Sequence, residues 1–278
     1  MVVRSGTGTS DIAGVFHGDN EIDAIYHGTT NVYTASRPRL YIINDRNDTL
    51  RIASEDLLSS ERIGSLTNFG VGENRPSGLA SHDGNLYMVG VANDVLYTIN
   101  TDTGRATRVG TSNNFGLNIV SVSGLFSYEN ELVTVDSNHG KRLLRINPST
   151  GAGIGFVDAS GIIPRDRNFD VSGITGGTVH KGSIYLVGSG LAGGSLFRVT
   201  STNLSGSSIT ADRLTTRFTV VGGGNVAAPE SLASNGENLY LISHNGNFYT
   251  VSTTPPYSLT FVTDIGSGTY SAMDFHQS

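Results

Sequence analysis

The sequence contains neither cysteine nor tryptophan in its 278 residues. Without cysteine, the chain can form no disulfide, no thiol nucleophile and no cysteine-ligated metal site. The missing indole ring weakens a carbohydrate-binding interpretation, although tyrosine can replace tryptophan as a platform for sugars. These two absences remove several common binding and catalytic chemistries.

The chain also lacks concentrated positive charge and long apolar segments. It has 18 Lys and Arg against 24 Asp and Glu, a net charge of −6, and the basic residues are scattered. Nucleic acid is therefore not an expected partner. No apolar run approaches the roughly 20 residues that span a bilayer, so membrane insertion is not expected. The opening "MVVRSGTGTS" has no apolar signal core, which predicts synthesis in the cytoplasm.

Glycine and small polar residues are abundant instead. The chain has 36 glycines, well above the average of about 7%, together with many Ser, Thr and Asn. This composition favours strands joined by turns over helices. The length suits one large domain with a small appendage.

An internal repeat organises most of the sequence. Its copies open with Pro76 ("PSGLASHDGNLYMVG"), Val122 ("VSGLFSYENELVTVD"), Val171 ("VSGITGGTVHKGSIYLVG") and Pro229 ("PESLASNGENLYLIS"). The opening recurs at the C-terminus as "YSAMDFHQS". Equivalent positions are Ser77, Ser123, Ser172, Glu230 and Ser271, at spacings of 46, 49, 58 and 41 residues. This period is typical of a four-stranded β-propeller blade.

Each copy contains the pattern of four strands. The second strand is a nearly continuous apolar run, as in "NLYMVG", which is expected when both faces of a sheet are covered. Two copies then have an Asn-x-x-Thr-Gly turn, at residues 100–104 and 147–151, which predicts a glycine with positive φ. The fourth strand is polar, as an outer edge should be.

The two ends of the repeat region complete one another. Residues 39–66 match the second, third and fourth strands of a blade but lack a first strand, which "TYSAMDF" at the C-terminus can supply. The sequence therefore predicts an all-β, five-bladed propeller over residues 37–278, closed by pairing of the C-terminal strand with the N-terminal blade. The order and spacing of the repeated strand motifs resemble those of closed five-bladed propellers. This resemblance implies the fold and not the function.

The loops between second and third strands should gather on one face of the ring and form a polar rim. The candidate residues of this rim are Asp45, Arg46, Asn93, Asp94, Asp136, His139 and His244. One hypothesis is a site for a polar ligand or partner; the alternative is that Asn, Asp and Gly only make the turns. The "NDRND" run lacks a calcium-loop ladder, and the histidines lack zinc spacings, so neither a metal nor a cofactor is expected.

A glycoside hydrolase would need two carboxyl groups in distinct environments. The candidates are Asp136, Asp170, Glu230 and Asp274. Serine is commoner than acid at the start of the first strands, and no Gly-x-Ser-x-Gly nucleophile motif is present. The expectation is therefore a protein without enzymatic activity.

The first 36 residues carry a short repeat of their own, of the form I-x-x-V/I-F/Y-H-G, and are expected to form a small β arm. Its candidate contact residues are Phe16, His17, Ile25, Tyr26, His27, Val32 and Tyr33. His17 and His27 are expected at strand ends beside glycines, pointing outward from separate turns rather than forming a metal pair. Strand pairs of this size are only marginally stable in isolation, so the arm should pack on the ring or on another chain.

The segment "IDAIYHGTTNVYTA" resembles a short element near the start of many tailed-bacteriophage virion proteins. The resemblance implies a non-enzymatic virion structural protein, as capsid decoration or in a tail or fibre. The arm would bind other virion proteins, and the propeller would be displayed, in several copies, for contact with a host-surface glycan or protein. Two alternatives stay open: a carbohydrate-binding or glycoside-hydrolysing propeller, and a bacterial interaction scaffold.

Overall fold

The computed structural model divides the chain into two compact units, Met1–Pro38 and Arg39–His276. It describes residues 2–5, 12–17, 20–21, 24–27, 30–34, 38–44, 49–53, 56–67, 76–90, 95–110, 115, 117, 119, 122–136, 142–159, 171–190, 194–201, 204–215, 217–223, 226, 228–266 and 269–276. Within these residues the regular structure is all β, and no helix is long and apolar enough to cross a membrane. The all-β prediction is confirmed.

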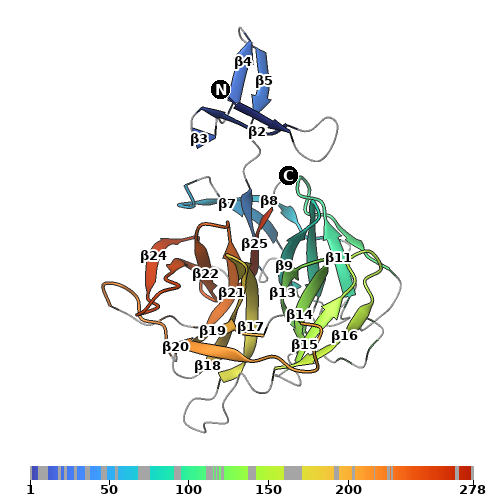
Figure 1. Cartoon of the computed structure of the whole chain (residues 1–278), viewed down its shortest axis with the longest axis vertical. Helices are drawn as coiled ribbons and strands as arrows, with labels where there is room; N and C mark the ends of the chain where they lie inside the picture. The colour runs from blue at the N-terminus through green and yellow to red at the C-terminus, as the bar shows by residue number, and fades with distance from the viewer. Residues whose placement is uncertain are drawn as a thin grey trace. The chain divides into compact units, whose positions relative to one another are not determined.

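The larger unit is a five-bladed propeller (Figure 1). Four blades are continuous in sequence. The first contains β9 (Pro76–His82), β10 (Asn85–Gly90), β11 (Val95–Ile99) and β12 (Ala106–Arg108). The second contains β13 (Val122–Tyr128), β14 (Glu131–Asp136), β15 (Arg142–Ile146) and β16 (Gly153–Asp158). The third contains β17 (Val171–His180), β18 (Ser183–Gly190), β19 (Ser195–Val199) and β20 (Ala211–Thr215). The fourth contains β21 (Pro229–Ser234), β22 (Leu239–Ser243), β23 (Asn247–Val251) and β24 (Leu259–Asp264).

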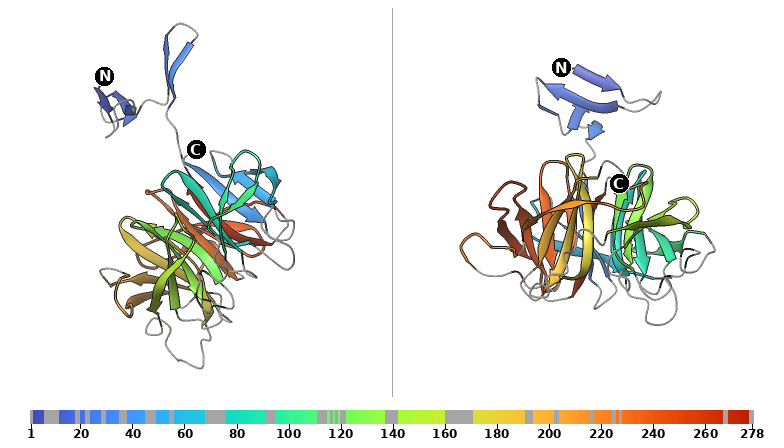
Figure 2. Two further views of the ribbon diagram at one scale, coloured as in Figure 1. Left: turned by 90° about the vertical axis from the view of Figure 1, so that its right-hand side faces the viewer. Right: turned by 60° about the horizontal axis from the view of Figure 1, so that its bottom comes forward.

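The fifth blade joins the two ends of the unit. Its strands are β25 (Tyr270–His276), β6 (Arg39–Asn44), β7 (Thr49–Ala53) and β8 (Ser60–Ser65). The C-terminal β25 pairs antiparallel with β6, from Tyr270 opposite Asn44 to His276 opposite Arg39. The predicted closure of the ring is therefore confirmed, and Figures 1 and 2 show the red C-terminal strand within the ring.

Five hydrophobic clusters hold the blades together, one between each pair of neighbours. Phe126 and Val133 of the second blade, for example, share a cluster with Leu186 and Phe197 of the third. The other four clusters join the remaining neighbours in the same way. Both faces of each sheet are thus covered, which explains why β22 is buried at every position. The fourth strands β16 and β24 have one buried residue each, and their other residues are exposed or partly buried.

The Asn-x-x-Thr-Gly turns adopt the predicted geometry. Asn100 Oδ1 accepts hydrogen bonds from the backbone nitrogens of Asp102 (3.1 Å) and Thr103 (2.9 Å), and Gly104 has φ +72°. The turn that starts at Asn147 repeats this arrangement and ends on Gly151 with φ +67°. A short polar side chain and a glycine therefore fix the register of the outer strands.

The smaller unit consists of two separate strand groups. The first is a three-stranded sheet of β1 (Val2–Ser5), β2 (Ile12–His17) and β3 (Asn20–Glu21); the second is a hairpin of β4 (Ala24–His27) and β5 (Thr30–Thr34). His17 and His27 each end a strand, as predicted, opposite Asn20 and Thr30 respectively. The doubled sequence motif thus marks the first strands of two successive hairpins.

Candidate functional site

The first strands of the blades line the inside of the ring and approach one another closely. A Cβ on Gly78 would lie 2.4 Å from the backbone carbon of Gly124, and one on Gly124 would lie 2.8 Å from the carbonyl oxygen of Thr175. A Cβ on Gly176 would in turn lie 2.8 Å from the carbonyl oxygen of Glu230. Gly78, Gly124 and Gly176 therefore permit backbone packing between blades.

Hydroxyl groups at the same level connect neighbouring blades. Ser77 Oγ donates to the carbonyl oxygen of Val122 (3.1 Å), and Ser123 Oγ donates to that of Ile174 (3.2 Å). Thr175 Oγ1 donates to the carbonyl oxygen of Pro229 (2.9 Å). These inner hydroxyls are engaged in holding the ring together, which leaves them poorly suited to act as nucleophiles.

Three histidines connect blades at the opposite ends of the first strands. His276 Nδ1 lies 2.9 Å from Ser81 Oγ, and His82 Nδ1 lies 2.8 Å from Ser127 Oγ. His180 Nδ1 lies 2.9 Å from Ser234 Oγ. In each case the histidine belongs to one blade and the serine to the next, and we call these contacts the histidine clasps.

Each clasp also packs against a tyrosine of its own blade. The ring centroids are 5.8 Å apart for His276 and Tyr41, 6.4 Å for His82 and Tyr87, and 6.0 Å for His180 and Tyr185. All three histidines are buried, and burial lowers the pKa of His180 and of His276. The clasps are thus structural contacts between blades that sequence analysis did not identify.

Asp274 lies beside the clasp of His276. Its Oδ2 accepts a hydrogen bond from the backbone nitrogen of Ser81 (2.6 Å) in the next blade. The residue keeps some exposed surface, but surrounding protein desolvates its carboxyl group and raises its pKa to about 7, against the lowering effect of two backbone hydrogen bonds. Burial therefore favours the protonated form of the Asp274 carboxyl group.

Glu230 occupies the other end of the first strands. Pro229 opposite Ser243 and Tyr270 opposite Asn44 are equivalent pairs, and a bulge follows each. Glu230 therefore lies three residues from the level of Asp274, roughly 10 Å along the strand direction at about 3.3 Å per residue. The structure does not bring these two predicted acids together at the same level.

His244 is the rim residue that meets a predicted acid. Its Nδ1 lies 3.1 Å from Glu230 Oε1, and the two side chains are 51% and 25% exposed. The carboxylate orients the imidazole ring at the surface, where the pair can bind a polar group. The two residues are 14 positions apart, so only the bulge in β21 and the β22–β23 turn place them in contact.

Asp136 differs from its predicted placement in the exposed rim. It is the last residue of β14, its side chain is fully buried, and it forms an ion pair with Arg142. The Arg142 guanidinium carbon also lies 4.1 Å from the centre of the Phe156 ring. A buried carboxylate needs a charged partner. Asp136 therefore has a structural role within its blade and is not accessible to a ligand.

Several other predicted positions lie outside the described residues. They are Asp45, Arg46, Asn93, Asp94, His139 and Asp170. In the part of the chain that the structure describes, no group of three or more His, Asp or Glu side chains could hold a metal ion. For the arm residues Phe16, His17, Ile25, Tyr26, His27, Val32 and Tyr33, the structure gives strand positions and register.

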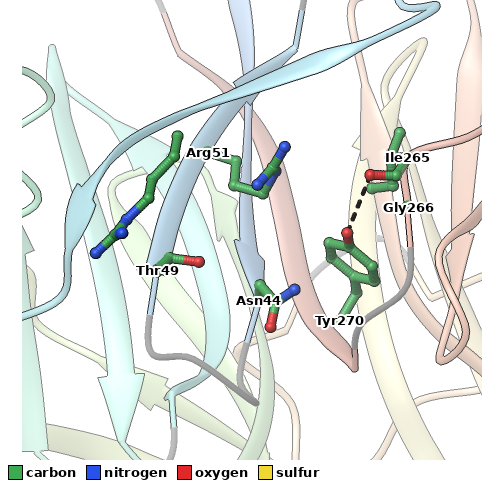
Figure 3. A pocket seen from close by; sticks show the side chains of 7 residues that line it. Asn44, Thr49, Arg51, Ile265, Gly266 and Tyr270 are labelled. Atoms are coloured by element: carbon green, nitrogen blue, oxygen red, sulfur yellow. Dashed lines mark hydrogen bonds between the residues drawn. The ribbon is translucent and has the colours of Figure 1, made fainter.

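A polar cavity of about 500 Å³ lies in the closing blade, at the same end of the strands as Glu230 and His244 (Figure 3). Its lining residues are Asn44, Thr49, Arg51, Arg62, Ile265, Gly266 and Tyr270. The β22–β23 turn supports it, since His244 O accepts from Tyr270 N (3.2 Å) and Gly246 O accepts from Ile265 N (3.1 Å). Sequence analysis missed this site, because Arg51 and Arg62 read as ordinary polar positions of outer strands.

Comparison with known proteins identifies the fold and no family. Neither a scan against protein-family models nor a search of curated proteins gives a match. By shape, 590 chains of solved structures match, a breadth that shows a common architecture rather than a shared activity.

Three solved structures illustrate this likeness. A chain of a nidogen/laminin complex aligns with a TM-score of 0.54 at 9% identity, over 86% of this chain and 98% of that one. A protein of unknown function from Bacteroides thetaiotaomicron aligns with a TM-score of 0.46 at 16% identity, over 88% of this chain and 61% of that one. A putative 6-phosphogluconolactonase from Bacteroides uniformis aligns with a TM-score of 0.41 at 15% identity, over 84% of this chain and 68% of that one. At such identities, the chain is similar to known β-propellers in fold alone.

Proposed function

We propose that this chain is a non-enzymatic structural protein of a tailed-bacteriophage virion. Residues 1–36 anchor it to other virion proteins, and the propeller is displayed for contact with a protein or with the host surface. The protein is made in the host cytoplasm and is carried, in several copies, on the particle. The observation that carries the proposal is the separation of Met1–Pro38 from a ring that closes without it.

The strand pairing of the closing blade supports an anchoring role for the arm. β25 occupies the first position of that blade, so all five blades have four strands without a contribution from the arm. Among the strands that the structure describes, β2 of the arm pairs with β1 and β3, and β4 pairs with β5. Small strand groups of this kind are only marginally stable in isolation. Their edge strands present unpaired backbone N–H and C=O groups, to which another chain can add a strand.

The placement of the described acids supports a role without hydrolysis. Retaining glycosidases hold their two carboxyl groups about 5 Å apart and inverting enzymes about 6.5–9.5 Å apart. Glu230 and Asp274 differ by three residues in level, and Asp136 is committed to Arg142. In the described part of the chain, the strand positions of Glu230 and Asp274 and the ion pair of Asp136 therefore favour the proposal over the hydrolase alternative.

Deletion of residues 1–36 tests the anchor. We expect the truncated chain to remain a soluble propeller with a melting temperature close to that of the full chain, but to be absent from purified particles. The measurement is immunoblotting of particles from infected cells whose only copy of the gene carries the deletion. Thermal melts of the two purified proteins are the control for folding.

The outcome also separates the alternatives. Incorporation of the truncated chain at the level of the full chain would remove the anchoring role. If the full chain itself is missing from particles but is recovered with bacterial proteins, the scaffold alternative replaces the virion proposal.

A further inference from the structure

The cavity of the closing blade has a lining that is unusual for a chain of net charge −6. Among the seven lining residues that the structure describes, two are arginines and none is acidic. Arg51 of β7 and Arg62 of β8 are directly opposite each other across the strand pair. Like charges in this position repel and destabilise a sheet, so the arrangement costs stability in the absence of a bound anion.

Serine oxygens, rather than carboxylates, hold the two arginines. Arg51 Nε donates to Ser60 Oγ (2.8 Å), and its Nη2 donates to the carbonyl oxygen of Ser60 (2.7 Å). Arg62 Nη2 donates to Ser65 Oγ. These bonds orient the guanidinium groups without neutralising them, which leaves positive charge at the cavity wall.

The rest of the lining is mostly polar. Asn44 and Thr49 are only 4% and 5% exposed, and their side chains lie at the ends of β6 and β7 where the two strands turn. Tyr270 closes one side, and its hydroxyl group donates to the carbonyl oxygen of Ile265 (3.1 Å; Figure 3). The cavity is thus lined by polar side chains beside two cations, with few apolar surfaces.

We propose that this cavity binds an acidic sugar residue, a hydroxylated ring that carries a carboxylate. Arginine matches the planar geometry of a carboxylate and can bind it through two parallel hydrogen bonds. The hydroxyl group of Thr49 is suited to a ring hydroxyl. The volume of about 500 Å³ lies within the usual range of small-molecule sites, roughly 300–1,000 Å³. The inference is independent of whether the chain is a virion protein.

The test is binding of glucuronate and N-acetylneuraminate to the full chain, measured by ligand-observed NMR and calorimetry. Glucose, acetate and inorganic sulfate serve as comparison compounds. We expect both acidic sugars to bind, glucose to bind at least tenfold more weakly, and the simple anions to compete only weakly. Arg62→Gln should weaken acidic-sugar binding at least tenfold, because it removes one cation from an exposed position without disturbing the core.

Arg39→Gln is the matched control, since Arg39 is exposed at the opposite end of β6 from Asn44. It removes the same charge from the protein and should leave binding unchanged. Thermal melts of both variants check that the fold is retained.

The remaining outcomes would overturn the proposal. Failure of both acidic sugars to bind, or equal weakening by Arg62→Gln and Arg39→Gln, would show that the cavity is not their site. Equal binding of glucose would remove the role of the arginines. Equal binding of acetate or sulfate would reduce the site to one for simple anions.

Discussion

Asp274 and the histidines His180 and His276 show how burial acts on single ionisable groups within the ring. Desolvation disfavours the charged form of each group, so it raises the pKa of Asp274 to about 7 and lowers the pKa of both histidines. The effects on stability have opposite signs. Stability linked to a raised carboxyl pKa is lost as the pH rises, whereas stability linked to a lowered histidine pKa is lost as the pH falls.

The substitution Asp274→Asn isolates the pH dependence of stability that comes from the raised pKa of Asp274. Below the unfolded pKa of about 4, the folded and unfolded states are both protonated; between about pH 4 and 7, only the folded state keeps the proton. We therefore expect the wild-type protein to lose about 2 kcal/mol of unfolding free energy, relative to the variant, across this range. Complete removal from water would give roughly 4 kcal/mol for three pKa units, but Asp274 keeps some exposed surface.

Urea unfolding at several pH values measures this difference. Asparagine can still accept the hydrogen bond from the backbone nitrogen of Ser81, so the variant should fold. The histidines titrate in both proteins and their contribution cancels in the comparison. Parallel stability curves for the two proteins would show that Asp274 does not retain a proton in the folded state.

At the scale of elements, the first strands depend on close backbone contact between neighbouring blades. Gly124 combines two requirements, since its φ is +64° and a Cβ would lie 2.8 Å from the carbonyl oxygen of Thr175. A flexible side chain could not move aside to make room for a Cβ at this position, because the obstructing atoms belong to the backbone. The inner strand β13 would have to move away from β17 to accept any larger residue.

Gly124→Ala should lower the free energy of unfolding by about 3 kcal/mol, from overpacking and from the positive φ. Gly155→Ala in the outer strand β16 is the matched control, since no atom lies within 4 Å of its added Cβ and its φ is not positive. That substitution should be neutral or slightly stabilising. Chemical denaturation of both variants measures the difference, and equal effects would contradict the close packing of the inner strands.

At the scale of the whole molecule, stability depends on closing the ring between its two ends. β25 places Ala272 in the cluster shared with the first blade, and Tyr270 and Met273 in the cluster shared with the fourth blade. One strand therefore contributes to two of the five interfaces between blades. Its loss would also expose the edge of β6, which could then pair with another molecule.

Removal of residues 270–278 should abolish cooperative unfolding and cause aggregation. The lost burial and strand pairing amount to about 5 kcal/mol or more, comparable to the total stability of many domains. Removal of only residues 277–278 leaves β25 complete and should have no effect. Thermal melts and size-exclusion chromatography compare the two; an unchanged melting temperature for the shorter chain would show that the ring does not need its closing strand.

The sequence by itself determined the repeat, the number of blades and the shared closing blade. These features follow from local patterns, because apolar runs, Asn-x-x-Thr-Gly turns and the Ser-Gly motif each act within one strand or turn. The unmatched strand at each end then leaves a single way to complete five sheets. Strand ends at His17 and His27 followed from the same kind of local pattern.

Only the tertiary structure decided which side chains meet between blades and at the surface. His276 and Ser81 are 195 residues apart, and the burial of Asp136 depends on Arg142 beyond its loop. Arg51 and Arg62 line a cavity because β7 and β8 pair in one register and β24 leads to β25 beside them. The contacts within a blade depend on the register of adjacent strands, whereas those between blades depend on how closely neighbouring sheets approach and tilt. Strand periodicity fixes the faces of each sheet but leaves that distance to the packing of the whole ring.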